Sequence, residues 1–164
     1  MRGWLLDTNV VSELRRPKPN PDVANFVAGQ DGQDLYVTEV TFAEIVYGIE
    51  QLSDPARRAD LQSWLDHTLR PLFAGRSLGI TEDVIVRWRT MVAEGRKRRH
   101  TFGQPDLFIA AIAALQDLIV VTRDVDEFVQ ARVMVFNPWT HKFHRHGKET
   151  LVRPPVTLEA ISKL

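Results

Sequence analysis

The sequence predicts an α/β domain built on a mainly parallel sheet. Segments with the pattern of strands alternate with segments with the pattern of helices along the chain. The segment 118–122 is continuously apolar, which is typical of a strand that helices cover on both faces of a parallel sheet. The segment 107–115 has the pattern of a helix that is apolar nearly all round, so we expect it to be buried in such a fold.

Composition agrees with one domain, with or without a tail. The chain has 164 residues and is 44% hydrophobic, which is enough for a core and argues against disorder. Lys and Arg number 21, as do Asp and Glu, so the net charge is zero; this argues against a bulk polyelectrolyte binder but not against a local basic patch. Cysteine is absent, which excludes disulfides and thiolate metal sites. No apolar run reaches the roughly 18 residues of a membrane span, and no signal peptide is recognisable, so we expect a soluble cytoplasmic protein.

The first strand ends at an acid. Residues 4–6 are apolar, Asp7 follows them, and the next two residues are types that start helices. A short helix over 10–14 is stopped by the proline-rich run 15–21. A lone Asp after a strand is usually a turn or cap residue. The carboxyl end of a parallel strand is also where ligands and catalytic groups collect.

The following elements bring a second acid. We expect a helix over 22–28, a strand over 35–37 and a helix over 38–52 whose apolar residues recur at helical spacing. Glu44 lies beside that apolar stripe and one turn before Gly48, which leaves room for a ligand to approach the acid. Taken alone, a solvated Glu and a Gly that lets helices pack are the simpler interpretations.

The middle of the chain adds two helices and a strand. We expect a helix over 53–72, a brief strand over 78–80 and a helix over 81–95 with Ile85 on its buried side. A dense basic run follows, made of Arg96, Lys97, Arg98 and Arg99. Such a run either favours the helix C-terminus as a solvated end or contacts phosphates.

Two further acids stand at the ends of buried elements. Asp106 lies in the first turn of the apolar helix, after Pro105 as the expected first helical position. Complementing the helix dipole is the ordinary role for such an acid. Asp124 follows the continuously apolar strand, and a last strand is expected over 132–136. We expect residues 141–164 to form a solvated basic tail, in which 158–164 has the pattern of two helical turns.

Carboxylates that converge in a fold raise one another's pKa, and a hard divalent cation relieves the repulsion. Oxygen ligands without cysteine favour Mg²⁺ or Mn²⁺ over Zn²⁺. A metal site of this kind suits hydrolysis of phosphodiesters.

A resemblance to a known family covers residues 4–139. It is carried, in order, by residues 5–13, 41–48, 71–76, 106–111, 121–124 and 135–139. With these stretches the chain resembles the PIN-domain family and, within it, the FitB-like branch of the VapC toxins of type II toxin–antitoxin systems.

The resemblance implies a Rossmann-like three-layer α/β/α fold, with a nuclease domain over 1–140 and a tail of unknown role over 141–164. It implies an acidic catalytic site, with Asn9 supporting the turn at Asp7 and Thr122 orienting a water or a carboxylate. Metal binding would fall to Asp7, Asp106 and Asp124. The catalytic acids would be Asp7, Glu44, Asp106 and Asp124.

The implied activity is a Mg²⁺- or Mn²⁺-dependent endoribonuclease, active on RNA, that forms a homodimer. A small antitoxin would block the site, and the complex would bind its own promoter DNA through the antitoxin. The chain departs from many relatives at Pro105 and around the fourth acid, where they have Asn followed by an acid three residues later. The fourth acid is therefore Asp124, Asp126 or Glu127, and we choose Asp124.

Two other classes fit part of the pattern. A receiver-like Mg²⁺-binding module needs a Lys after a buried strand, and the sequence has none in that position. A PIN domain that serves as a non-catalytic scaffold usually lacks some of the acids, whereas all four are present here.

Overall fold

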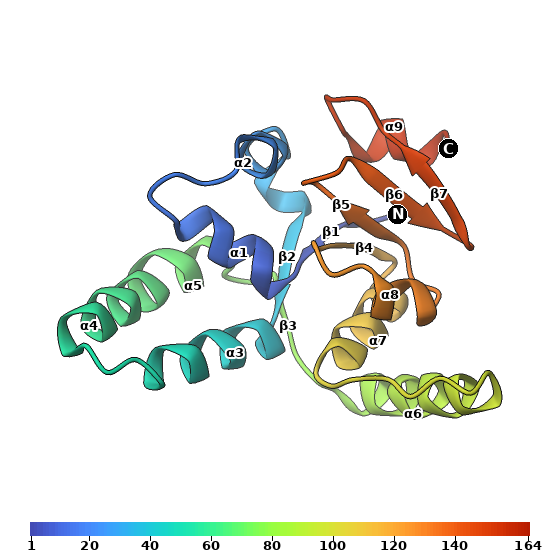
Figure 1. Cartoon of the computed structure of the whole chain (residues 1–164), viewed down its shortest axis with the longest axis horizontal. Helices are drawn as coiled ribbons and strands as arrows, with labels where there is room; N and C mark the ends of the chain where they lie inside the picture. Colours follow the sequence, from blue (N-terminus) through green and yellow to red (C-terminus); the bar gives the residue numbers. More distant parts are fainter.

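The central sheet has seven strands in the order β3-β2-β1-β4-β5-β6-β7 (Figure 1). This computed structural model describes residues 1–164. The first five strands in this order are parallel, and β6 and β7 are antiparallel additions at one edge. The strands are β1 (Gly3–Leu6), β2 (Leu35–Thr38), β3 (Ser77–Leu78), β4 (Leu118–Val121), β5 (Val135–Asn137), β6 (Lys142–Arg145) and β7 (Lys148–Leu151).

Helices cover both faces of this sheet. They are α1 (Thr8–Arg15), α2 (Pro21–Ala28), α3 (Glu39–Glu50), α4 (Pro55–Trp64), α5 (Arg70–Leu72), α6 (Glu82–Lys97), α7 (Asp106–Gln116), α8 (Asp126–Gln130) and α9 (Leu158–Ser162). A 3₁₀ turn, Gly32–Asp34, precedes β2, and a π-helical segment, Leu65–Leu69, joins α4 to α5.

The sheet separates two apolar clusters because successive side chains of a strand point to opposite faces. Trp4 and Leu6 of β1 pack with residues of α1, α2 and α3, whereas Leu5 packs with α6, α7 and α8. All four residues of β1 and of β4 are buried. The predicted three-layer α/β/α class with a mainly parallel sheet is confirmed.

Helix starts follow capping chemistry that is visible in the sequence. The side chains of Asp7, Thr38 and Thr81 cap α1, α3 and α6 by accepting from backbone N–H groups of the first turn. Glu13 is buried at the end of α1, where it accepts from the backbone N–H of Asn20 (3.0 Å) and pairs with Arg16 (3.2 Å). That contact anchors the proline-rich connection to α2.

Four local expectations are wrong. The strand expected over 78–80 is Ser77–Leu78, and Pro105 is the N-cap of α7 instead of its first helical residue. Ile85 is 45% exposed because α6 packs mainly on α7 and leaves its other side in solvent. The helix expected over 53–72 is interrupted by the π-helical segment.

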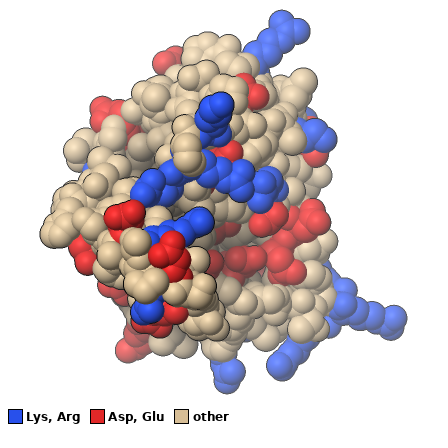
Figure 2. Space-filling view, turned by 60° about the vertical axis from the view of Figure 1, so that its left-hand side comes forward, with Lys and Arg blue, Asp and Glu red and all other residues tan.

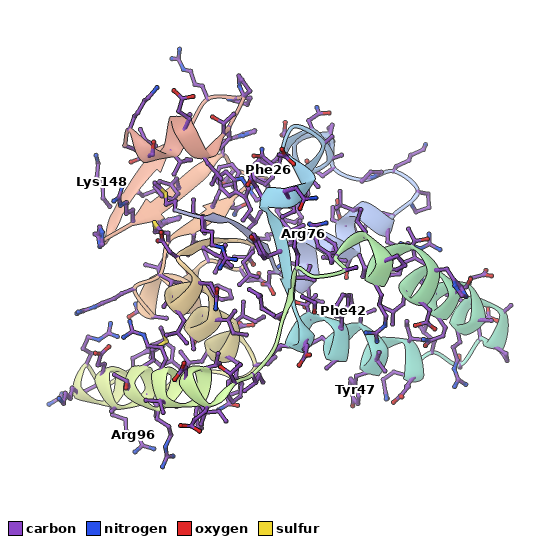
Figure 3. The ribbon with its side chains drawn as sticks, turned by 180° about the vertical axis from the view of Figure 1, so that it is seen from behind. Phe26, Phe42, Tyr47, Arg76, Arg96 and Lys148 are labelled. Carbon is purple, nitrogen blue, oxygen red and sulfur yellow. The ribbon has the colours of Figure 1, made fainter.

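The largest correction concerns the C-terminus. The strand expected over 132–136 as the last one is Val135–Asn137, and residues 141–164 are not a solvated tail. They form β6, β7 and α9, and four of their side chains are buried in the cluster that contains Trp4: Phe143, Val152, Val156 and Ile161. Figure 3 shows the label of Lys148 at the outer edge of this added unit. None of the helices has both the length and the apolar character needed to cross a membrane.

Candidate active site at the carboxyl edge of the sheet

Asp7 is fixed where β1 ends. Its backbone N–H donates to the carbonyl of Val121 (3.0 Å), which continues the pairing of β1 with β4 for one residue. Its carboxylate accepts from the N–H of Thr8 (2.8 Å) and from the hydroxyl of Thr122 (2.8 Å). The residue is only 5% exposed. A buried acid is therefore held in one orientation at the edge of the sheet.

Thr122 and Asn9 form a network that joins the ends of β1 and β4. The hydroxyl oxygen of Thr122 accepts from Asn9 Nδ2 (2.9 Å) and from the N–H of Asp124 (3.1 Å). Asn9 Nδ2 is also 3.3 Å from Asp124 Oδ2, and Asn9 Oδ1 accepts from the N–H of Arg123 (3.2 Å). The two residues predicted to support the site thus connect Asp7 to Asp124.

Glu44 and Asp106 reach the same region from two helices. Glu44 is half-buried on α3, and its Oε1 atom is buried without a hydrogen-bond partner. Asp106 is half-buried and begins α7, close enough to Asp7 for the two charges to interact. An acceptor buried without a partner is unusual in a folded protein. The Oε1 atom of Glu44 is therefore available to a ligand.

Burial and mutual repulsion perturb these acids. Burial raises the pKa of Asp7 to about 6, although hydrogen bonds from Thr122 and Thr8 act in the opposite direction. The charges of Glu44 and Asp124 raise this pKa further. The four predicted acids therefore interact electrostatically, as groups at one site do.

The pKa values of Asp106 and Glu44 are raised as well. Burial raises the pKa of Asp106 to about 6, and the charges of Asp7, Glu127 and Asp124 add to it. Burial also raises the pKa of Glu44; the nearby Thr8 hydroxyl opposes this shift and the charge of Asp106 reinforces it.

The geometry separates the three candidates for the fourth acid. Asp124 raises the pKa of both Asp7 and Asp106, whereas Glu127 raises only that of Asp106. Glu127 also accepts from the N–H of Gly103 (3.2 Å) and lies 3.7 Å from His100 Nε2, so it anchors the loop before α7. Asp126 is exposed at the start of α8 and affects neither pKa. This arrangement favours Asp124.

The acids fit a hydrated divalent cation. No three His, Cys, Asp or Glu side chains lie close enough together, as they stand, to hold a metal ion. Mg²⁺ commonly keeps several waters and binds through only one or two carboxylates, so such a closed ligand set is not required. The donors are all oxygens, burial and neighbouring charges raise the pKa of Asp7 and of Asp106, and Glu44 has an unused acceptor. These features suit a hard cation.

The basic run, residues 96–99, lies at the C-terminal end of α6. Figure 3 places Arg96 at the outer end of this helix, pointing away from the sheet. Arg98 donates to the carbonyl of Gln130 (2.8 Å), which ties α6 to α8. The side chains of Arg96, Lys97 and Arg99 make no hydrogen bond or ion pair within the chain. On the face drawn in Figure 2, Asp and Glu side chains gather beside a hollow that Lys and Arg side chains border.

Sequence reasoning missed a pocket next to Glu44. Its volume is about 680 Å³, and Thr8, Arg15 and Arg57 are among the residues that line it. Arg57 comes from α4, and no spacing in the sequence relates it to the acids. Only the packing of α1, α3 and α4 places it there.

Residues 4–133 match the model of the PIN domain. The chain therefore belongs to the PIN-domain family, which also removes the receiver-like alternative.

Several relatives carry the names of toxins or ribonucleases. Toxin FitB of Neisseria gonorrhoeae is 36% identical over 135 residues, which cover 82% of this chain and 97% of FitB. VapC ribonuclease Y4jK of Sinorhizobium fredii is 32% identical and covers 82% of this chain and 96% of its own length. The crystal structure of FitAcB from Neisseria gonorrhoeae superposes with a TM-score of 0.79 at 36% identity, over 83% of this chain and 98% of that one.

The raised pKa values predict how stability depends on pH. The folded state binds the protons of Asp7 and Asp106 more tightly than the unfolded state does. The free energy of unfolding of the metal-free protein therefore falls as the pH rises from about 4 to about 6, and these acids cause no further change above that range. For Asp7 the shift from 3.8 to about 6 corresponds to about 3 kcal/mol, at about 1.4 kcal/mol for each pKa unit.

Urea denaturation in EDTA at several pH values measures this fall. The Asp7→Asn variant, which cannot titrate at this position, is expected to show a smaller fall than the natural protein. Equal falls in the two proteins would contradict the assigned pKa of Asp7.

Proposed function

We propose that this protein is a metal-dependent endoribonuclease and the toxin component of a type II toxin–antitoxin module. The observation that carries the proposal is the group of acids at the carboxyl edge of the sheet, where Thr122 and Asn9 link Asp7 to Asp124 and where the charges of Glu44 and Asp106 also act on Asp7 or on one another. Support also comes from family membership, since relatives that align over nearly their whole length are named toxin FitB and VapC ribonuclease.

The roles follow from the chemistry of the site. Asp7, Asp106 and Asp124 are proposed to hold a hydrated Mg²⁺ or Mn²⁺, directly or through its bound waters, with Glu44 as the fourth catalytic acid. When bound, such a cation supplies an activated water and stabilises charge on the phosphate and the leaving oxygen. The chain itself orients the acids, through the hydrogen bonds of Thr122 and Asn9 to Asp7 and Asp124.

Metal removal tests the proposal. RNA cleavage by the purified protein is expected to stop in EDTA and to return when Mg²⁺ or Mn²⁺ is added in excess. Added Ca²⁺, a larger ion that takes more ligands in a less rigid geometry, is the comparison. The readout is the disappearance of a labelled single-stranded RNA on a denaturing gel. Cleavage that persists in EDTA would contradict a metal-dependent nuclease, and no cleavage with either metal would favour a non-catalytic scaffold.

The proposed partner is a small antitoxin whose gene lies beside that of the toxin. The structure of FitAB bound to an IR36 DNA fragment, 34% identical to this chain with a TM-score of 0.78, is a complex of this kind. A cation is the group that best fills a pit of carboxylates, and Arg binds carboxylates with two parallel hydrogen bonds. We propose that the antitoxin blocks the acids in this way and that promoter DNA is bound through the antitoxin.

Co-purified complex is expected to cleave RNA far more slowly than free toxin and to gain activity when the antitoxin is proteolysed. A complex as active as the free protein would contradict inhibition at the acids. The free toxin is proposed to be cytoplasmic and to form a homodimer. Its mass in sedimentation equilibrium tests the homodimer.

The run Arg96, Lys97, Arg98 and Arg99 stays a proposed set of phosphate contacts. Because Arg98 also holds α8, Arg96 and Lys97 give a cleaner test. Their joint replacement by Ala is expected to weaken RNA binding and flatten its salt dependence, without changing metal affinity.

A further inference from the structure

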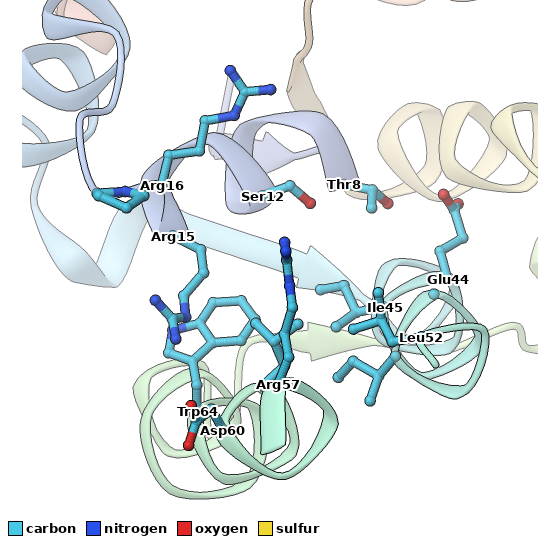
Figure 4. A pocket seen from close by; sticks show the side chains of 14 residues that line it. Thr8, Ser12, Arg15, Arg16, Glu44, Ile45, Leu52, Arg57, Asp60 and Trp64 are labelled. Atoms are coloured by element: carbon cyan, nitrogen blue, oxygen red, sulfur yellow. The ribbon is translucent and has the colours of Figure 1, made fainter. Parts of the chain in front are cut away.

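A pocket begins beside Glu44 and runs along α1, α3 and α4 (Figure 4). Thr8 and Glu44 line the end that adjoins the acidic site, Arg15 and Trp64 line the far end, and Arg57 lies between the two ends. With a volume of about 680 Å³, the pocket has room for more than a water or an ion. Any ligand that is bound at the acids and extends along α1 therefore enters this pocket.

Two arginines in the pocket have no acidic partner. Arg57 extends from α4 across the pocket toward α1 in Figure 4, and neither it nor Arg15 forms an ion pair with a carboxylate. Asp60 lines the same end without pairing with either of them. By contrast, the neighbouring Arg16 pairs with Glu13 at 3.2 Å.

Arg15 is also held in place. Its guanidinium carbon lies 5.7 Å from the centroid of the Trp64 ring, so the cation packs on the aromatic face. Packing on a ring leaves the donors at the edge of a guanidinium group free. Such a group loses less conformational freedom when it binds an anion than a freely rotating side chain does.

We propose that this pocket binds the RNA backbone next to the scissile phosphate, with Arg57 and Arg15 as its phosphate contacts. The inference rests on the proposed nuclease function and adds the direction in which the substrate leaves the acids. Phosphodiester oxygens match the two parallel donors of a guanidinium group. The hydroxyls of Thr8 and Ser12, which also line the pocket, are donors or acceptors for a ribose.

A protein segment is the competing occupant, because the pocket also has apolar residues such as Ile45 and Leu61. Two observations favour RNA. Neither Arg57 nor Arg15 forms an ion pair, although Asp60 lines the same pocket, and one of the catalytic acids, Glu44, belongs to the pocket wall. The acids alone repel a polyanion, so nearby cations are needed to hold it.

The test measures RNA binding in an Asp7→Asn background, so that the probe is not cleaved. The probe is a short labelled single-stranded RNA, titrated at several salt concentrations. Arg57→Ala and Arg15→Ala are each expected to weaken binding about tenfold and to reduce the salt slope by about 0.7, the value for one lost phosphate contact. Arg57→Lys is expected to keep the slope but lose part of the affinity, because it keeps the charge without the paired donors.

Arg58→Ala is the matched control. Arg58 is the next residue on α4, is exposed, and does not line the pocket, so its loss changes the net charge and the helix in the same way. The RNA affinity of the Arg58→Ala variant, and the salt slope of its RNA binding, are expected to match those of the Asp7→Asn background protein. If all three Ala variants behave alike, or if Arg57→Ala keeps full RNA binding but loses the co-purified antitoxin, the inference is wrong.

Cleavage by the natural protein separates this outcome from failure of the proposed function. Metal-dependent cleavage together with unaltered binding by Arg57→Ala and Arg15→Ala overturns the pocket alone. Absence of both cleavage and RNA binding overturns the pocket and the nuclease function together.

Discussion

Replacing Asp7 or Asp106 with Asn is expected to lower the rate of RNA cleavage at least about a thousandfold, while the protein remains folded. An Asn side chain has nearly the same shape but lacks the negative charge that a divalent cation needs. In the metal-free protein the change also removes a charge that burial and neighbouring acids disfavour. The free energy of unfolding is therefore expected to stay level or to rise at neutral pH, even though an amide side chain accepts fewer hydrogen bonds than the carboxylate of Asp7 does.

Initial cleavage rates and urea midpoints in EDTA measure the two effects. Asp126→Asn is the matched control, because Asp126 is an acid near the site that is exposed and does not affect the pKa of Asp7 or Asp106. This control is expected to keep its activity. Full activity in both the Asp7 and Asp106 variants would remove the acids from the mechanism, and unfolding of both would indicate a structural role.

Shortening Phe143 to Ala is expected to destabilise the protein by about 3–5 kcal/mol, the usual cost of removing a buried aromatic ring. Phe143 is 1% exposed on β6 and belongs to the cluster that contains Trp4. Removal of residues 141–164 as a whole would leave β5 as an open edge and uncover that cluster. The truncated chain is therefore expected to be unfolded or insoluble.

Leu151→Ala is the control for this prediction. Leu151 lies on the neighbouring strand β7 but is 70% exposed, so its shortening is expected to change stability by no more than about 0.5 kcal/mol. Denaturant titration of both variants gives the comparison. A Phe143→Ala variant as stable as Leu151→Ala would mean that the C-terminal unit is a dispensable addition.

The C-terminal unit also sets this chain apart from the relatives compared with it. FitB aligns over 97% of its own length but over only 82% of this chain, and the PIN-domain match ends at residue 133. The strands β6 and β7 extend the sheet beyond β5, and α9 adds Ile161 to the core. The unit covers the edge of β5 that would otherwise present unpaired backbone groups.

The sequence by itself determined the layered fold and the places of the acids. Both are local properties: a continuously apolar strand indicates cover on both faces, and an acid directly after such a strand must lie at the carboxyl edge of the sheet. Asp7 and Asp124 could be assigned to that edge for this reason. Asp106 could be assigned because it begins a helix that is apolar nearly all round.

Only the tertiary structure decided the rest, because it depends on contacts between distant segments. The short strand β6 has one fully buried residue, Phe143, among basic neighbours, so its composition resembles that of a solvated tail. Asp124 and Asp126 could be told apart only in the folded protein, where Asp124 acts on the pKa of Asp7 and of Asp106 and Asp126 does not. Arg57 reaches the pocket beside Glu44 only because α4 packs against α3, and no pattern along the chain encodes that approach.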